Sequence, residues 1–221
     1  MIVLAVIISA WLILREPKQD VFLRLEPYKF TAVIDAGHGG EDGGARSICG
    51  MLESGINLEI AKKTDLLMRF YGIKTVMVRT EDISIHDEGA DTFSEKKRSD
   101  LINRVKLTNN TPNAVLLSIH QNSFTESQYF GAQVFYARDD ASKALADILQ
   151  AQMLNLDRDN TRKIKPVYED LYLINNVNCP AVLVECGFLS NPKDSANLVR
   201  APYQTKVAMA ITSGVVNWEG R

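Results

Sequence analysis

The chain lacks cysteine pairs, an excess of charge of one sign and internal repeats, and each absence removes a class of protein. Its three cysteines, Cys49, Cys179 and Cys186, form no CxxC pair, so they indicate neither a structural zinc cluster nor a disulfide framework. We expect free thiols that are mostly buried. A formal net charge of -2 argues against a nucleic-acid partner, whose binding surface is usually clearly basic. What remains is one ordinary globular domain, for which 221 residues are sufficient.

The N-terminal residues 1–14, MIVLAVIISAWLIL, are almost wholly apolar and uncharged. As a helix they would span roughly 21 Å, which is less than the roughly 30 Å hydrocarbon core of a bilayer. The stretch predicts a signal peptide or signal anchor, although it lacks a preceding basic region and a small-x-small cleavage site. The alternative is a buried N-terminal helix of the domain. Residues 15–27 contain two prolines and predict a linker.

This organisation predicts an exported, extracytoplasmic protein with a folded domain over residues 28–221. The protein is then either secreted or associated with the membrane through its N-terminal segment.

From Phe30 onward, apolar strands alternate with helical patterns. The expected strands cover about 30–36, 73–79, 113–120, 131–137 and 180–188, and the expected helices cover about 53–70, 96–109, 140–155, 192–199 and 203–218. This alternation predicts an α/β fold with three layers: a mainly parallel sheet of about six strands with helices on both faces. In such sheets, functional sites collect beyond the carboxyl ends of the strands.

Three of the apolar strands lead into a histidine or an acid. His38 follows AVIDAG, His120 follows AVLLSI, Glu185 follows AVLV, and Glu53 begins the helix after the glycine loop. Each residue alone has a simpler explanation: a strand-end histidine is commonly structural, and Glu53 suits the positive end of a helix dipole. Glu185 is harder to dismiss, because a carboxylate within PAVLVECGF is costly to bury unless it is paired or bound to a metal.

Together, two histidines and two glutamates match the needs of a catalytic zinc site. Two imidazoles and one carboxylate leave an open position for water, whose pKa the zinc lowers. A second carboxylate can then take the water proton and pass it to a leaving amine.

Other interpretations of these segments fit less well. The loop GHGGEDGG lacks the GK[ST] ending of a P-loop and places Asp42 where a dinucleotide-binding loop has its third glycine. The chain also has no G-x-S-x-G motif, which a serine hydrolase of the α/β type would need.

His86 and the basic run 158–165 are expected in solvated loops, with contact to an anionic substrate as the alternative for the basic run. Asn57, one turn after Glu53, and Asp35 are candidates to orient the ligands. The alternative for Asp35 is that it binds loop amides.

At these residues the chain resembles the zinc-dependent N-acetylmuramoyl-L-alanine amidases of the amidase-3 type, which are cell-wall hydrolases. The resemblance covers about 30–218. It lies in VIDAGHGGEDGGA (33–45), ESGINLEIA (53–61), VRTED (78–82), LINRVKLTNN (101–110), VLLSIHQN (115–122) and DLYLINNVNCPAVLVECGFLSN (170–191). It implies one Zn2+ per chain held by His38, Glu53 and His120, with Glu185 as the catalytic acid/base. The implied reaction is hydrolysis, in peptidoglycan, of the amide between the muramic acid lactyl group and L-alanine of the stem peptide.

With no wall-binding repeat or SH3-like module evident, the chain resembles the germination-specific spore-cortex amidases. That similarity implies a role in muramic-δ-lactam formation in the forespore or cortex space, and an accessory lipoprotein partner. The alternatives are a non-catalytic wall-binding or scaffold domain, and another zinc peptidase or deacetylase acting on wall material.

Overall fold

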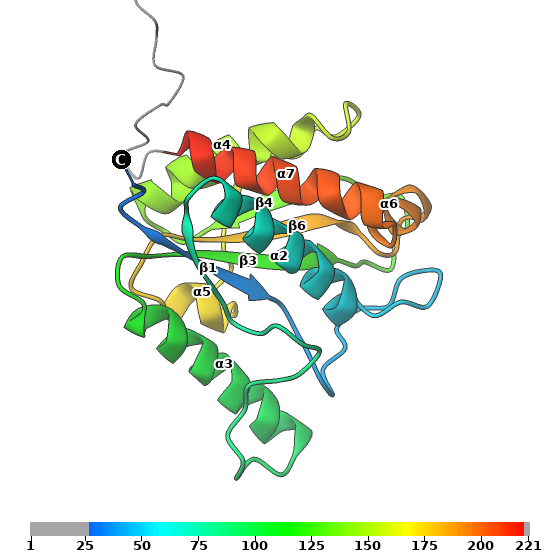
Figure 1. Cartoon of the computed structure of the whole chain (residues 1–221). Helices are drawn as coiled ribbons and strands as arrows, with labels where there is room; N and C mark the ends of the chain where they lie inside the picture. The colour runs from blue at the N-terminus through cyan, green and yellow to red at the C-terminus, as the bar shows by residue number, and fades with distance from the viewer. Residues whose placement is uncertain (1–26, 219–221) are drawn as a thin grey trace, which may run out of the picture.

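A computed structural model describes residues 27–218 and shows a three-layer α/β fold built on one six-stranded sheet (Figure 1). The strands are β1 (Thr31–Ala36), β2 (Lys74–Met77), β3 (Ala114–Asn122), β4 (Gln133–Tyr136), β5 (Lys165–Pro166) and β6 (Ala181–Phe188), in the spatial order β2-β1-β3-β6-β4-β5. Strands β2, β1, β3 and β6 are parallel, whereas β4 is antiparallel to β6. The predicted fold class is confirmed.

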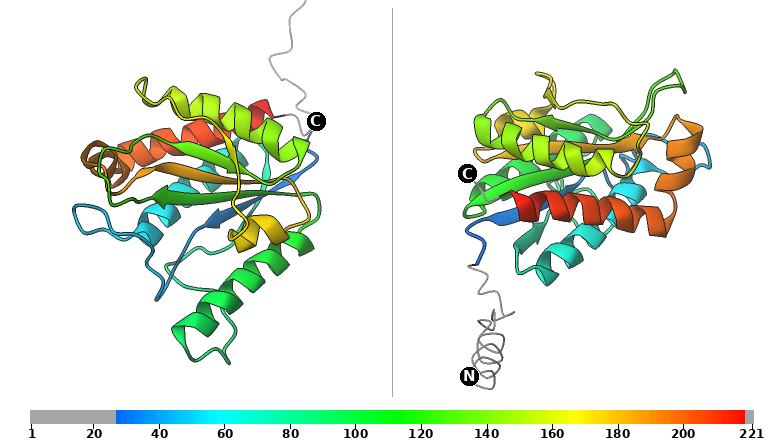
Figure 2. Two further views of the ribbon diagram at one scale, coloured as in Figure 1. Left: turned by 180° about the vertical axis from the view of Figure 1, so that it is seen from behind. Right: turned by 90° about the horizontal axis from the view of Figure 1, so that it is seen from above.

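Helices cover both faces of the sheet. They are α2 (Glu53–Phe70), α3 (Phe93–Asn110), α4 (Asp140–Leu154), α5 (Tyr172–Asn176), α6 (Pro192–Leu198) and α7 (Ala201–Asn217). Helices α2, α4 and α7 lie together on one face, and α3 and α5 lie on the other (Figures 1 and 2). No helix within residues 27–218 is long and apolar enough to cross a membrane.

The central strands β1, β3 and β6 are mostly apolar because both of their faces are buried. Consecutive residues alternate between two cores: Ile34, Leu117 and Val184 pack with α2, α4 and α7, whereas Val33, Leu116 and Leu183 pack with α3 and α5. By the same period of two, His120 and Glu185 project to the α3 and α5 face. The alternation therefore determines on which side of the sheet a site can form.

Helix α3 and strand β4 differ from the pattern expected, and the short elements β5 and α5 were not part of that pattern. Helix α3 begins at Phe93 instead of about Lys96, because Thr92 and Glu95 form a capping box at its N-terminus. Strand β4 is antiparallel to β6 and parallel to β5. No helix lies between β3 and β4, and a return in the direction of β3 would require a long crossover connection.

The ends of the described chain lie side by side, since the rings of Phe30 and Trp218 are 5.5 Å apart. The predicted signal segment 1–14 and nearly all of the predicted linker 15–27 lie outside the described residues, so they stay predictions.

The three thiols are free as expected, but only Cys186 is buried. Cys49 is exposed, so the expectation of mostly buried cysteines is wrong.

Candidate metal centre

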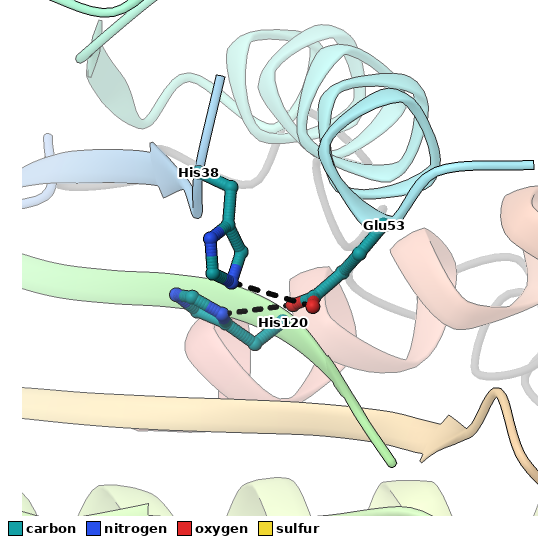
Figure 3. Close-up of side chains that lie close together, drawn as sticks. All are labelled: His38, Glu53 and His120. Atoms are coloured by element: carbon teal, nitrogen blue, oxygen red, sulfur yellow. Dashed lines mark hydrogen bonds and ion pairs between the residues drawn. The ribbon is translucent and has the colours of Figure 1, made fainter. Parts of the chain in front are cut away.

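His38, Glu53 and His120 converge at the carboxyl edge of the sheet, from the loop after β1, the start of α2 and the end of β3 (Figure 3). Each contributes one potential ligand atom, and these atoms all lie within 4.8 Å of one another. Nδ1 of His120 is 3.0 Å from Oε1 of Glu53, and Nε2 of His38 is 3.3 Å from Oε2 of the same carboxylate. The structure therefore brings these three sequence-predicted side chains together.

The loop after β1 presents His38 in an unusual backbone conformation. His38 has a φ of 62°, which is uncommon for a residue other than glycine and requires support from its surroundings. The carbonyl of His38 accepts a hydrogen bond of 2.8 Å from Nη2 of Arg104, and its ring Nδ1 is 3.0 Å from Oδ2 of Asp42. Hydrogen bonds with Asp42 and Glu53 outweigh the opposing effect of burial and raise the pKa of His38 to about 9.

Backbone and side-chain donors hold the Glu53 carboxylate in place. Its two oxygens accept hydrogen bonds from the backbone N–H groups of Ala45, at 2.9 Å, and Gln121, at 3.1 Å. The Asn57 amide donates to Oε1 at 3.2 Å and to the Gly37 carbonyl at 3.1 Å. Burial alone would raise the pKa of Glu53, but the two imidazoles hold it well below its usual range. Asn57 therefore contacts Glu53, as expected from its position one helical turn later.

Asp35 was expected either to orient the candidate ligands or to bind loop amides, but its partners are two side chains. Its carboxylate accepts hydrogen bonds from the Arg104 guanidinium and from Oγ of Ser118, at 2.7 Å for the latter. Arg104 in turn donates to the carbonyls of Ala36 and His38. Asp35 thus supports His38 through Arg104 and contacts neither imidazole directly.

Arg104 and Arg79 bond the backbone of the candidate site, and no sequence pattern revealed this. Arg79 is buried and donates to the carbonyls of Ala36, Gly37 and Ser54, at distances between 2.8 and 3.1 Å. The two guanidinium groups therefore fix the backbone on both sides of the candidate ligands. Arg79 lies in VRTED (78–82) and Arg104 in LINRVKLTNN (101–110), but neither has a sequence spacing that reveals its contacts.

Glu185 lies beside this group but is not a member of it. Its Cα is paired in register with that of His120 across β3 and β6, just before the register of this pair shifts between His120 and Asn122. Its Oε2 is covered and has no hydrogen-bond partner within residues 27–218. Burial raises the pKa of Glu185 to about 7. A buried carboxylate oxygen without a partner is costly, which suits a group kept available for chemistry.

A cleft of about 230 Å³ opens at this edge between α3 and α5. Its lining includes His38 and His120 of the candidate metal centre, together with Leu171 and Tyr172. His86 lies away from the three-residue group and bonds Oγ of Ser84 through Nδ1, at 2.9 Å, so its interpretation as a loop histidine is retained. The basic run is different, because Arg162 is partly buried and hydrogen-bonded instead of solvated.

The donor set fits a divalent metal ion. Two imidazoles and one carboxylate within 4.8 Å are the ligand types of catalytic zinc sites, and Glu185 is a nearby carboxylate with an oxygen that accepts no hydrogen bond in the described chain. The fold and this site define the class of three-layer α/β proteins with a histidine–glutamate–histidine group at the carboxyl edge of the sheet.

Comparison with known proteins gives the family. The model of the N-acetylmuramoyl-L-alanine amidase family, Amidase_3, matches residues 32–217. The chain belongs to this family, in agreement with the resemblance noted in its motifs.

Individual relatives agree with this assignment. The chain is 36% identical over 187 residues to the germination-specific N-acetylmuramoyl-L-alanine amidase of Bacillus subtilis, covering 84% of this chain and 78% of the relative. Its fold is similar to that of the CwlD amidase of Clostridioides difficile, solved in complex with the GerS lipoprotein, with a TM-score of 0.82 and 38% identity over 86% of this chain and 98% of that one. The catalytic domain of the amidase CwlV from Bacillus (Paenibacillus) polymyxa var. colistinus is 31% identical, with a TM-score of 0.72, over 86% and 97% of the two chains.

Proposed function

We propose that this amidase uses one Zn2+, held by His38, Glu53 and His120, to hydrolyse the amide between the muramic acid lactyl group and L-alanine. Glu185 is proposed as the catalytic acid/base. The observation that carries the proposal is the convergence of three ligand-type atoms within 4.8 Å, beside a carboxylate in register with His120. When bound, zinc would supply a Lewis acid that polarises the amide carbonyl and lowers the pKa of water.

The chain's own residues account for the proton transfers. Glu185 takes a proton from the attacking water while the water oxygen forms a bond to the amide carbon. The same carboxyl then gives that proton to the alanine nitrogen as the carbon–nitrogen bond breaks. The products are a free lactyl carboxylate on the sugar and a peptide with a free L-alanine amino terminus. Arg79 and Arg104 keep the backbone around His38 in position throughout.

The experiment that tests these roles compares two site variants with one control. We expect Glu185→Gln to retain zinc and lose turnover, and His120→Ala to lose both. Glu88→Gln, an exposed glutamate in another loop, serves as the matched control and keeps both. Zinc content and digestion of purified peptidoglycan, analysed by mass spectrometry, give the two measurements. Normal cleavage by Glu185→Gln would overturn the role of Glu185.

The same digestion separates the alternative functions. An amidase frees an L-alanine amino terminus and leaves the muramic acid intact, whereas a deacetylase or peptidase leaves different products. A wall-binding domain would hold peptidoglycan and release nothing, even with zinc bound.

We further propose that the enzyme acts outside the cytoplasm on spore-cortex peptidoglycan, in the step that precedes muramic-δ-lactam formation, assisted by a lipoprotein. The 36% identity to the germination-specific amidase supports the cortex role, and the CwlD–GerS complex supports the partner. Deleting the gene in a spore former is expected to remove muramic-δ-lactam from the cortex, and wild-type lactam content in the deletion strain would overturn this role. Purification from membranes with a tagged chain tests for the lipoprotein.

A further inference from the structure

The basic run 158–165 is a motif that the proposed chemistry leaves unused, and the structure gives one of its residues a defined place. Arg162 lines a groove of about 420 Å³ together with Tyr129, Phe130 and Gln133, while Lys163 and Lys165 contribute further positive charge. This groove lies on the β4 side of Glu185, on the opposite side from the cleft between α3 and α5.

The guanidinium of Arg162 is held in a fixed orientation. Nε donates to the carbonyl of Phe130 at 2.6 Å, and Nη1 donates to Oε1 of Gln133 at 3.0 Å. The guanidinium also stacks on the ring of Phe188, with its carbon 4.3 Å from the ring centroid. A partly buried arginine held on three sides loses little conformational entropy when it binds an anion.

Its charge is not neutralised within the described chain. No carboxylate of residues 27–218 lies within 4.0 Å of Arg162. Among the carboxylates of the described chain, Asp194 acts on it most strongly. Oδ2 of Asp194 already accepts hydrogen bonds from the backbone N–H groups of Gly131 and Phe188, at 2.8 and 2.9 Å. Arg162 is therefore a preorganised cation with capacity for an external carboxylate.

The groove begins next to the proposed catalytic carboxylate. Gln133 and Glu185 are directly opposite in register across β4 and β6, so their Cβ atoms lie roughly 5 Å apart on the same face of the sheet. Gln133 connects this position to Arg162 by its hydrogen bond. Because an extended peptide advances about 3.3 Å per residue, a carboxylate in the first few residues after the scissile amide can reach the guanidinium.

Substrate charge decides which half of the substrate suits this groove. In intact peptidoglycan the lactyl carboxyl is part of the scissile amide, so the sugar side contributes no charge there, whereas the stem peptide carries free carboxylates. We propose that Arg162 is a specificity-determining residue that binds a stem-peptide carboxylate on the alanine side of the scissile bond. This inference rests on the proposed amidase function, and it places the peptide along β4 and β5.

The test uses the zinc-loaded full chain and a stem peptide that begins with L-alanine followed by an acidic residue, compared with the same peptide amidated at that carboxyl. Calorimetry on these two product-like peptides requires no turnover. We expect wild type to bind the acid at least tenfold more tightly than the amide, and Arg162→Gln to bind both alike. Arg158→Gln, an exposed arginine in the same run, is the matched control and keeps the preference.

Turnover on the corresponding muramyl peptides gives a second readout. Arg162→Gln is expected to raise KM for the acidic substrate tenfold to a hundredfold with little change in kcat, and to leave KM for the amidated substrate unchanged. Arg162→Lys should recover part of the loss, because it keeps the charge without the two-pronged geometry.

The proposal would be overturned if wild type bound the acid and the amide equally, or if the Arg158 and Arg162 variants lost the preference equally. The comparison within wild type remains informative even if Arg162→Gln fails to fold. Absence of all cleavage with the binding preference intact would instead count against the proposed function.

Discussion

The ring of His120 occupies the space next to Gly37 so closely that no side chain fits there. A Cβ on Gly37 would lie 2.0 Å from Nε2 of His120 and 2.1 Å from its Cε1. The backbone is locked at the same point, since the N–H of Gly37 donates to the carbonyl of Ile119 at 3.1 Å. One candidate ligand therefore packs directly on the loop that carries the other, His38.

Gly37→Ala should displace the His120 ring and weaken zinc binding at least tenfold. Overpacking of this kind costs about 1–3 kcal/mol of stability. Gly55→Ala is the matched control, because a Cβ at Gly55 meets no atom within 4 Å and alanine favours the helix by roughly 0.5–1 kcal/mol. Zinc titration and thermal melting of both variants give the measurement. Wild-type zinc affinity in Gly37→Ala would show that the close packing of His120 on Gly37 does not position this ligand.

Glu53→Gln should lose zinc and turnover together. The carboxylate accepts hydrogen bonds from the N–H groups of Ala45 and Gln121, and a glutamine would present an NH2 group to one of these donors. We expect a loss of about 1–3 kcal/mol in folding stability as well. Glu59→Gln on the same helix, where the glutamate pairs with Lys63 at the surface, should change stability by less than about 1 kcal/mol. Metal analysis and melting curves distinguish the two, and retained zinc in Glu53→Gln would remove Glu53 from the ligand set.

Asn57→Ala should lower zinc affinity without removing a ligand. Asn57 holds both the Glu53 carboxylate and the carbonyl of Gly37, and removing such an orienting group typically costs ten- to a hundredfold in metal affinity. Asn109→Ala, on α3 and away from the metal centre, should leave zinc affinity unchanged. Competition with a chelator measures both values; equal affinities would mean that Asn57 has a packing role only.

The pairing of Asp35 with Arg104 predicts how stability depends on acid. Burial alone would raise the pKa of Asp35, but Arg104 and the Ser118 hydroxyl outweigh it and hold that pKa below its usual value. A carboxyl with a depressed pKa in the folded state stabilises the protein above its unfolded pKa of about 3.9, and this stabilisation is lost as pH falls below that value.

Asp35→Asn should therefore cost about 3–5 kcal/mol at pH 7, because it leaves a buried arginine with one partner fewer. The difference from wild type should shrink as pH falls from about 4 towards 2. Denaturant unfolding at several pH values measures it, and a difference that stays constant with pH would exclude the ion pair as its source.

Much of the architecture followed from local patterns. The apolar run in β3 and the glycine loop before α2 placed His120, His38 and Glu53 correctly, because strand ends and helix starts are set by nearby residues. Arg79 and Arg104 could not be found in this way. Each acts on carbonyls far away in the chain, and a cation in a helix or at the end of a strand has no pattern that distinguishes it from a solvated one.

The sequence by itself therefore determined the alternation of strands and helices and the mainly parallel sheet. It also determined the edge of the sheet at which the two histidines and two glutamates of the candidate site would lie. These depend on hydrophobic period and on turn residues, which are local properties. Only the tertiary structure decided that three of the four form a close group while Glu185 stands beside them. It also decided that Arg162 is held in a groove instead of in solvent. Those facts depend on side-chain contacts between distant segments, which only packing of the whole domain fixes.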